Sequence, residues 1–322
     1  MPCREVLKVG VFLLRVLITG GAGFIGHNLA VYLKRRGYSV VVLDSLERPS
    51  KRALARLKEE DISVVKCDVR DKYTVKSHVE DSDVVIHAAA YISVEESFEK
   101  PVEYIANNVG GTASVASSCL ELGKLLVHFS SAAVYGEPVK TPIPEEHPLK
   151  PLSPYGLSKL MSEQVVEFYG KLGLKYVIIR PFNVYGPGQS EAYAGVITKF
   201  ITRACSSEPL IIHGDGLQTR DFIHVEDVSR LVELVVEKTP VGLVFNAGSG
   251  VPTRIVDLAR VVIRLVGVNV EILHAPPRPG HIRDSWADIS KAQRILGFQP
   301  RVVLEDGLRA TIRELCRDLT RF

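Results

Sequence analysis

The sequence predicts an α/β protein with a doubly wound parallel Rossmann sheet and a smaller, mixed α/β lobe towards the C-terminus. Three observations predict this fold. Short β-branched apolar runs alternate with amphipathic stretches, a glycine-rich turn joins the first such pair, and loop-rich segments become frequent after residue 183. Repeated strand–helix units indicate a parallel sheet covered by helices on both faces. In such a sheet, binding sites lie beyond the carboxyl ends of the strands.

The first unit is a strand, a glycine-rich turn and a helix. Residues 15–18 are expected to form a buried strand, and residues 27–36 an amphipathic helix. In the turn between them, Gly20 allows a tight bend, Gly23 lets the backbone approach a pyrophosphate, and Gly26 lets helix and strand pack closely. The helix N-terminus offers unpaired N–H groups and a positive dipole end to phosphates. This unit therefore predicts a dinucleotide site.

The second apolar run, residues 40–43, ends at an acidic residue, Asp44. A carboxylate here accepts hydrogen bonds from the adenosine ribose and would repel a 2′-phosphate. NAD is therefore expected rather than NADP. The basic residues Arg48, Lys51 and Arg52 follow closely and act against this preference.

The remaining elements continue the alternation. Further strands are expected at residues 63–66, 83–87, 125–130, 175–180 and 243–246. Helices are expected at residues 102–122, 154–172 and 225–238. The predicted nucleotide-binding domain is 1–183 with 223–249 returning to it, and the substrate lobe is 184–222 with 250–322. Residues before about 14 are expected to be a short extension or the start of the first strand.

Composition excludes several classes of protein. The 322 residues are 46% hydrophobic, which is enough for a large core. A net charge of +3 does not favour nucleic acid or an anionic membrane as partner. No apolar run approaches the roughly 20 residues of a membrane helix. The five cysteines are scattered without C-x-x-C spacing, so neither a disulfide framework nor a metal site is expected, and a cytoplasmic location is the default.

Tyr155 and Lys159 are the expected catalytic pair. Ser153 and Pro154 start a helix as N-cap and first residue, which places Tyr155 and Lys159 on one helix face. A free tyrosine titrates near pH ~10. The ammonium and a positive nicotinamide should lower that pKa, so that the tyrosine takes a proton from a sugar or alcohol hydroxyl.

A hydroxyl at the end of the strand at 125–130 is the third expected catalytic group. Ser130 and Ser131 both stand there, and the hydroxyl would share a hydrogen bond with the substrate oxygen and the phenol. Spacing alone leaves open which serine has this role.

With these motifs in order, the chain resembles the NAD-dependent sugar-nucleotide epimerase/dehydratase family of extended short-chain dehydrogenases/reductases. The resemblance runs from Arg15 to about Phe298. It implies that Ser131 is the catalytic hydroxyl and that Asp68 meets the adenine amino group. The cofactor-binding residues that it implies are Gly20, Gly23, Phe24, Ile25, Gly26, Asp44, Ser45, Asp68, Val69, Ala88, Ala89, Ala90, Asn107, Ser130, Tyr155, Lys159 and Pro181.

The resemblance also implies a nucleotide-sugar site. Its residues are expected to be Ser131, Asn183, Val196, His213, Gln218, Arg220, Arg278 and Ser285. Asn183, Arg220 and Arg278 would meet the diphosphate and ribose, and Val196 and His213 would line the uridine pocket. His281 stands where the family usually has an aspartate, so a nearby contact is expected to differ.

The activity implied is NAD-dependent interconversion of UDP-galactose and UDP-glucose through oxidation at C4, rotation and re-reduction. The small Ser285 suggests that N-acetylated UDP-sugars also fit. Ala132 and Ala133 replace the Asp-Glu pair of the family's 4,6-dehydratases. A UDP-glucuronate 4-epimerase, a net dehydrogenase or reductase, and a nucleotide-sensing protein without turnover remain as alternatives. The resemblance implies a homodimer formed through the helices at 102–122 and 154–172.

Overall fold

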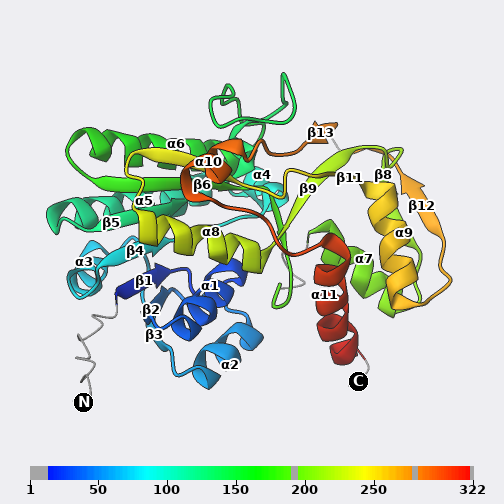
Figure 1. The fold of residues 1–322 in the computed structure, drawn as a ribbon, viewed down its shortest axis with the longest axis horizontal. Helices are drawn as coiled ribbons and strands as arrows, with labels where there is room; N and C mark the ends of the chain where they lie inside the picture. The colour runs from blue at the N-terminus through cyan, green and yellow to red at the C-terminus, as the bar shows by residue number, and fades with distance from the viewer. Residues whose placement is uncertain (1–13, 190–194, 278–281, 320–322) are drawn as a thin grey trace, which may run out of the picture.

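The computed structural model describes residues 14–189, 195–277 and 282–319. Within them the chain forms a large lobe around a parallel sheet and a smaller lobe beside it (Figure 1). The described start of the chain leads directly into the first strand of the large sheet.

The large lobe contains a seven-stranded sheet in the order β10-β6-β5-β4-β1-β2-β3, with every neighbouring pair parallel. Chain order reverses between β1 and β4, which is where an open α/β sheet forms its binding crevice. The strands are β1 (Arg15–Thr19), β2 (Ser39–Asp44), β3 (Ser63–Lys66), β4 (Val84–His87), β5 (Leu125–Phe129), β6 (Lys175–Pro181) and β10 (Leu243–Ala247). All the expected strands are confirmed.

Helices cover both faces of this sheet, and alternate strand residues face opposite layers. Val16 and Ile18 pack with α1 and α8 on one side, whereas Leu17 packs with α3, α5 and α6 on the other. The helices of the lobe are α1 (Phe24–Arg35), α2 (Lys51–Glu59), α3 (Lys72–Glu80), α4 (Val94–Glu99), α5 (Pro101–Glu121), α6 (Pro154–Lys171) and α8 (Val225–Lys238), with a 3-10 turn η1 (Ala132–Val134). The Rossmann prediction is therefore confirmed.

The smaller lobe surrounds its own hydrophobic core. Its strands are β7 (Asn183–Tyr185), β8 (Leu210–His213), β9 (Thr219–His224), β11 (Pro252–Arg254), β12 (Ile272–Ala275) and β13 (Asp284–Ser285). β9 pairs with β7, β11 and β13, and β8 pairs with β12. Helices α7 (Val196–Cys205), α9 (Ile255–Val266) and α11 (Leu304–Leu319) enclose this core. The helix α10 (Ser290–Leu296) instead packs its buried side against the large lobe.

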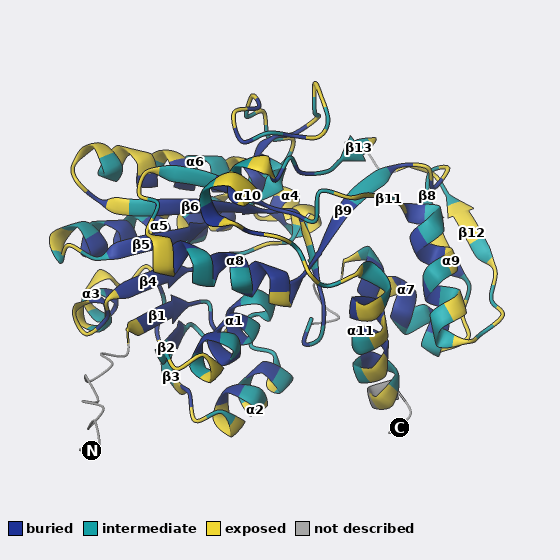
Figure 2. Ribbon diagram, viewed as in Figure 1, coloured by how far each residue is buried: buried dark blue, intermediate teal, exposed yellow. Residues whose placement is uncertain are grey.

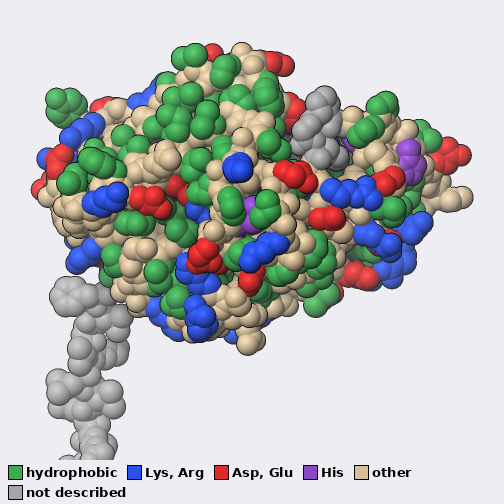
Figure 3. Space-filling model, turned by 90° about the horizontal axis from the view of Figure 1, so that it is seen from above, with side chains coloured by type: hydrophobic (Ala, Val, Ile, Leu, Met, Phe, Trp, Pro, Cys, Tyr) green, Lys and Arg blue, Asp and Glu red, His purple; other side chains and the backbone are tan. Residues whose placement is uncertain are grey.

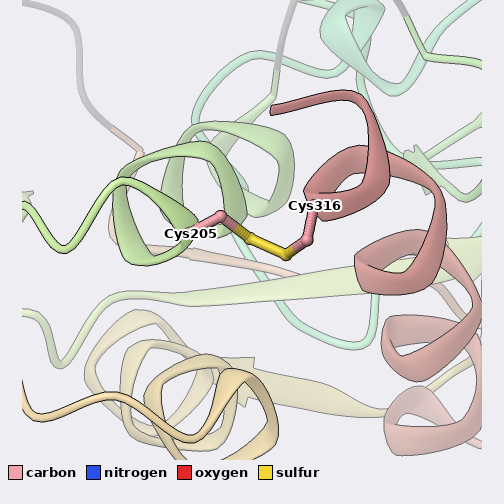
Figure 4. Close-up of a disulfide and its surroundings, with 2 residues drawn as sticks. All are labelled: Cys205 and Cys316. Carbon is pink, nitrogen blue, oxygen red and sulfur yellow. A yellow bond between two sulfur atoms is a disulfide. The ribbon is translucent and has the colours of Figure 1, made fainter. Parts of the chain in front are cut away.

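A disulfide joins Cys205 at the end of α7 to Cys316 on α11 (Figure 4). The expectation of no disulfide is therefore wrong. The two residues are 111 positions apart, so their spacing carries no signal, and the packing of α7 against α11 brings their Cα atoms to 5.7 Å. Cys67 and Cys119 are free and buried.

Burial follows the layers of the fold. The strands of the large sheet are mostly buried, while the outer faces of the helices are exposed (Figure 2). In the part of the chain that the structure describes, no helix is long and apolar enough to cross a membrane.

Candidate active site

The glycine-rich turn lies at the carboxyl end of β1, next to the crossover in strand order. Gly20 has a φ of +69°, and a Cβ built on it would lie 2.6 Å from the backbone of Ala89. A Cβ on Gly26 would lie 2.3 Å from the carbonyl oxygen of Gly20. Both positions therefore require glycine. This packing brings the N-terminus of α1 against the turn, where its free N–H groups suit a pyrophosphate.

Asp44 stands at the end of β2, beside the turn. One carboxylate oxygen accepts a hydrogen bond from the N–H of Ala22 at 2.9 Å, and the other accepts one from Leu46 at 2.9 Å. These bonds fix the carboxylate and leave lone pairs on both oxygens for hydroxyl donors. The geometry fits a ribose diol and not a 2′-phosphate.

Two of the basic residues that follow Asp44 are paired with acids. Arg48 donates to both carboxylate oxygens of Glu96, at 2.7 and 2.8 Å, and Arg52 forms an ion pair with Glu314. The guanidinium of Arg48 lowers the pKa of Glu96 to about 2. These pairs reduce the positive charge offered to a 2′-phosphate, so the argument for NAD is stronger than the sequence alone suggests.

A single groove runs from the glycine-rich turn to the catalytic helix, and every cofactor residue expected from the sequence lines it. Six further residues line the groove that the sequence motifs do not predict, although each is a sequence neighbour of a motif. They are Glu47, Arg48, Cys67, Tyr91, Ile92 and Phe129. Glu47 and Arg48 both contact Tyr91 in the lining of the groove. The Tyr91 hydroxyl donates to Glu47 at 2.9 Å, and the Arg48 guanidinium lies 4.4 Å from the Tyr91 ring centre. We call this contact the adenosine strap, because it lies at the Asp44 end.

Tyr155, Lys159 and Ser131 come together at the other end of the groove. The Ser153 hydroxyl caps α6 by accepting from the N–H of Gly156 at 3.0 Å, as expected. Tyr155 and Lys159 follow on one face and are both buried. The Ser131 hydroxyl lies close enough to the Tyr155 phenol to lower its pKa. The Ser130 hydroxyl is buried without a partner among the described residues and lines the cofactor groove. The catalytic role of Ser131 and the cofactor-binding role of Ser130 stay predictions.

The charges of the pair are set mainly by burial. Burial raises the pKa of Tyr155, and the Ser131 contact offsets part of this rise. Burial lowers the pKa of Lys159 to about 8, and Glu163 opposes that shift. The lowering of the tyrosine pKa that was expected from the ammonium and the nicotinamide together stays a prediction. In the described chain, the Lys159 ammonium donates a hydrogen bond to the carbonyl oxygen of Phe129.

Asn108, next to the expected Asn107, organises the backbone of the site. Its side chain accepts from the N–H of Tyr91 at 2.8 Å and donates to the Tyr91 carbonyl at 3.0 Å and the Ser158 hydroxyl at 2.9 Å. It thus joins the strap to the catalytic helix. In the sequence Asn108 is marked only by its place next to Asn107, and two adjacent asparagines do not show which of them has this role.

Apart from Ser131, the expected nucleotide-sugar residues that the structure describes lie in the smaller lobe or at its border. Ser285 on β13 pairs in register with Arg220 on β9. Gln218 donates to the carbonyl of His213 at 2.8 Å, and Asn183 donates to the carbonyl of Asp221 at 2.9 Å. Val196 begins α7. Arg278 and His281 lie outside the described residues.

Arg220 is directed at backbone carbonyls. It donates to Thr219 at 2.7 Å and to Ile282 at 2.8 Å, with a longer contact to Arg283 at 3.4 Å. Burial lowers its pKa. In this arrangement Arg220 holds the strand that carries Ser285, and its contact with a diphosphate stays a prediction.

Comparison with known proteins places this geometry in a family. The family model described as NAD-dependent epimerase/dehydratase matches residues 16–248. The chain belongs to this family. Its cofactor is accordingly NAD, and the groove residues described above fit that dinucleotide. Among the described residues, no cluster of three or more His, Cys, Asp or Glu side chains is placed to hold a metal ion.

Three relatives illustrate the range of the family. A UDP-glucose 4-epimerase of Mycolicibacterium smegmatis is 35% identical over 305 residues, which cover 93% of this chain and 97% of that protein. The structure of a UDP-glucose 4-epimerase of Thermotoga maritima with UDP-glucose has a TM-score of 0.89 and 34% identity, covering 95% of this chain and all of that one. A UDP-glucuronic acid 4-epimerase of Bacillus cereus, in complex with UDP-glucuronic acid and NAD, has a TM-score of 0.88 and 31% identity, with 95% and 100% coverage.

Proposed function

We propose that this enzyme is a nucleotide-sugar 4-epimerase that interconverts UDP-galactose and UDP-glucose. The observation that carries the proposal is the burial of Tyr155 and Lys159 on one face of α6 at the inner end of the NAD groove. Ser131 lies close enough to the phenol to lower the pKa of Tyr155. A sensor of nucleotides would need no such triad. The similarity to two UDP-glucose 4-epimerases supports the same conclusion.

The residues have separate tasks in this reaction. Tyr155 takes the proton of the C4 hydroxyl and later returns it, while the Ser131 hydroxyl shares a hydrogen bond with the same oxygen. The ammonium of Lys159 and the positive nicotinamide both favour the phenolate. NAD, when bound, accepts the hydride from C4 and gives it back. Between the two transfers the keto-sugar turns about its diphosphate linkage, so the net change is inversion at C4.

The segment after Ser131 argues against elimination of water. Ala132 and Ala133 form the start of η1 and carry only methyl groups. They cannot supply an acid and a base, which a 4,6-dehydratase requires at this place. Epimerisation needs neither group.

Substrate breadth depends on Ser285. Its side chain is small and half-buried on β13, next to Arg220 on β9. We infer that this position leaves room for an N-acetyl group at C2 of the sugar. Ser285→Tyr should therefore keep activity on UDP-galactose and lose activity on UDP-N-acetylgalactosamine.

A UDP-glucuronate 4-epimerase is the second candidate, because the B. cereus relative acts on that class of sugar. A sugar carboxylate needs a nearby cation. Arg220 is one described cation among the expected sugar-site residues, and its two terminal nitrogens donate to the carbonyl oxygens of Thr219 and Ile282. This arrangement favours a neutral sugar. A net dehydrogenase or reductase would use the same Tyr155–Lys159 pair but would consume external cofactor.

We also propose that the protein is a homodimer formed through α5 and α6. Val102 on α5 is 76% exposed, and Leu157 and Phe168 on α6 are 43% and 59% exposed. Figure 3 looks onto the side of the molecule on which α6 lies, and hydrophobic side chains gather there. A second copy that pairs the same two helices would cover this surface by two-fold symmetry.

A cytoplasmic location is proposed as well. Two of the described cysteines, Cys67 and Cys119, are free and buried, as in many intracellular proteins. The Cys205–Cys316 bridge is the opposing observation, because stable disulfides are rare in the cytosol outside hyperthermophiles.

The deciding experiment is to incubate the purified protein with UDP-galactose, without added NAD, and to assay for UDP-glucose. Conversion supports a self-contained 4-epimerase with retained cofactor. UDP-glucuronate and UDP-N-acetylgalactosamine are tested in parallel at equal enzyme. Conversion of UDP-glucuronate alone would favour the second candidate, and turnover that requires stoichiometric NAD would favour a net dehydrogenase.

A further inference from the structure

A third buried ionisable residue lies on the catalytic face of α6. Tyr155, Lys159 and Glu163 follow one another at intervals of four residues, so they share one face of the helix. Their exposed fractions are 9%, 4% and 1%. A carboxylate as buried as that of Glu163 is costly unless it is paired and hydrogen-bonded. The proposed reaction gives it no task so far.

The partner of Glu163 is Arg180 on β6, which is 3% exposed. The Arg180 guanidinium donates to the two carboxylate oxygens at 2.9 and 2.6 Å, in a two-pronged arrangement. Its third donor nitrogen donates to the Tyr135 hydroxyl at 3.1 Å and to the carbonyl of Glu145 at 2.8 Å. Tyr135 and Glu145 belong to the segment that begins at Ser131. Glu163 thus ties the catalytic helix to the segment that carries the catalytic serine.

Glu163 also supplies the negative charge near Lys159. The carboxylate of Glu163 raises the pKa of Lys159 against the larger, lowering effect of burial. The ionisable side chains that face Lys159 from the sheet are His87 on β4 and His128 on β5. Burial lowers the pKa of His87 to about 3 and that of His128 well below its usual value, so both are neutral at pH 7.

The other neighbours of Lys159 carry no compensating charge. Tyr155 is on the same helix face, and burial keeps it in the neutral form in the chain alone. Helix α5 contributes two polar side chains here, Asn108, which donates to Ser158, and Thr112, which contacts His87. Neither side chain is charged. Arg180 is positive and is paired with Glu163.

We propose that Glu163 is a positioning residue of the reaction, whose carboxylate is the buried counter-charge that keeps Lys159 protonated and whose bonds to Arg180 hold the catalytic helix against the Ser131 segment. The proposal rests on the proposed function, because it assigns Lys159 the task of favouring the Tyr155 phenolate. Glu163 touches neither substrate nor cofactor in this account and acts through Lys159.

If Glu163 acts through its charge, removing that charge should shift the titration of Lys159 to lower pH. A purely structural role predicts no such shift. In Glu163→Gln the anion is gone and the Arg180 charge is left uncompensated, so Lys159 should lose its proton at lower pH. Turnover should then decline from a lower pH on the alkaline side, by roughly 1 pH unit, as expected for loss of one close opposite charge. In the double variant Glu163→Gln/Arg180→Met both charges are gone, and the displacement should be smaller.

The test measures the titration of Lys159 directly. Protein labelled with ¹³C at lysine Cε is titrated by NMR, with the Lys159 signal assigned by its loss in Lys159→Met, and the pH profile of kcat is recorded with UDP-galactose. Glu167→Gln is the matched control, because it makes the same change one turn further along the helix at an exposed position. The expected result is a lower titration midpoint and a lower alkaline limit in Glu163→Gln, with both unchanged in Glu167→Gln.

A folded Glu163→Gln with lower stability but an unchanged Lys159 midpoint would overturn the proposal and leave only a structural ion pair. If Glu163→Gln does not fold, the Lys159 titration midpoint is measured in Glu163→Gln/Arg180→Met instead. This double variant should fold more readily, because a neutral pair is tolerated better than a lone buried charge. The NMR titration needs no substrate. A wild type that converts none of the UDP-sugars would therefore refute the proposed function while the Lys159 midpoint still decides the role of Glu163.

Discussion

Lys159 donates a hydrogen bond to the carbonyl oxygen of Phe129, with 2.6 Å between the nitrogen and the oxygen. This bond joins the catalytic helix α6 to the end of β5, directly before Ser130 and Ser131. The ammonium is held there although burial lowers the pKa of Lys159 to about 8. A charge kept at a costly position in a groove is typical of a functional site.

The first prediction concerns how much the buried ammonium of Lys159 lowers the free energy of unfolding. Lys159→Met should raise the free energy of unfolding at pH 7. In the unfolded chain the lysine titrates at 10.5 and in the folded chain at about 8, so between these values the unfolded state binds more protons and stability rises with pH. The cost is fully present below pH 8 and amounts to about 3 kcal/mol, less the lost hydrogen bond to Phe129.

Urea unfolding of wild type and Lys159→Met at several pH values checks this. The advantage of the variant should shrink as the pH rises from 8 towards 10.5. A difference in stability that is independent of pH would contradict the assigned titration of Lys159.

The second prediction isolates the base. Tyr155→Phe removes the phenol and keeps the ring that meets Tyr104 edge-on. The kcat for UDP-galactose should fall by about 10²–10⁴-fold, the usual contribution of a positioned acid–base group. Bound NAD, measured after denaturing the protein, should be unchanged. Tyr169→Phe, the same change near the end of α6, should leave kcat as in wild type, and an equal loss in both variants would speak against Tyr155 as the base.

Much of the site was predictable because its signals are local in the sequence. The turn around Gly20 and the acid at Asp44 each follow an apolar run, and the carboxyl ends of parallel strands meet at one edge of the sheet. Tyr155 and Lys159 needed only the helix period. These local rules predict the glycine-rich turn, Asp44, Tyr155 and Lys159, whereas the resemblance to the family supplies the other expected cofactor residues.

Other features depend on contacts between distant segments. Spacing does not decide between Ser130 and Ser131, because the position of each hydroxyl depends on how the end of β5 meets α6. The Cys205–Cys316 bridge depends on the packing of α7 against α11. The raised pKa of Tyr155 follows from burial, which a helix period does not measure.

The third prediction tests the adenosine strap formed by Glu47, Arg48 and Tyr91. Arg48→Met removes the pair with Glu96 and the contact with the Tyr91 ring. NAD should leave the protein faster, by about 5-fold at most, because a partly exposed ion pair contributes little and is screened by salt. The measurement is NAD retained after gel filtration at low and high salt. Arg35→Met removes an ion pair with Glu60 instead, and retention equal to that of Arg48→Met would show that the strap has no effect.

The fourth prediction concerns the bridge between α7 and α11. Cys205→Ser should lower the free energy of unfolding by about 2–4 kcal/mol, because the cross-link closes a long loop and restricts the unfolded chain. Reductant should destabilise wild type to a similar extent and leave Cys205→Ser unaffected. Unfolding curves with and without reductant measure both effects. Equal sensitivity of the two proteins to reductant would mean that the bridge does not stabilise the lobe.

The fifth prediction concerns assembly. Phe168 on α6 is 59% exposed, and a second copy covering α5 and α6 would bury it. Phe168→Glu would then place a charge on each side of the same two-fold interface, and two unpaired carboxylates there oppose association. Light scattering after gel filtration should give twice the 35.5 kDa chain mass for wild type and a single chain mass for the variant. Tyr73→Glu makes the equivalent change at a 90% exposed position on α3 and should remain dimeric. A wild type that elutes as a single chain would refute the interface, because its exposed apolar side chains would then have no partner copy.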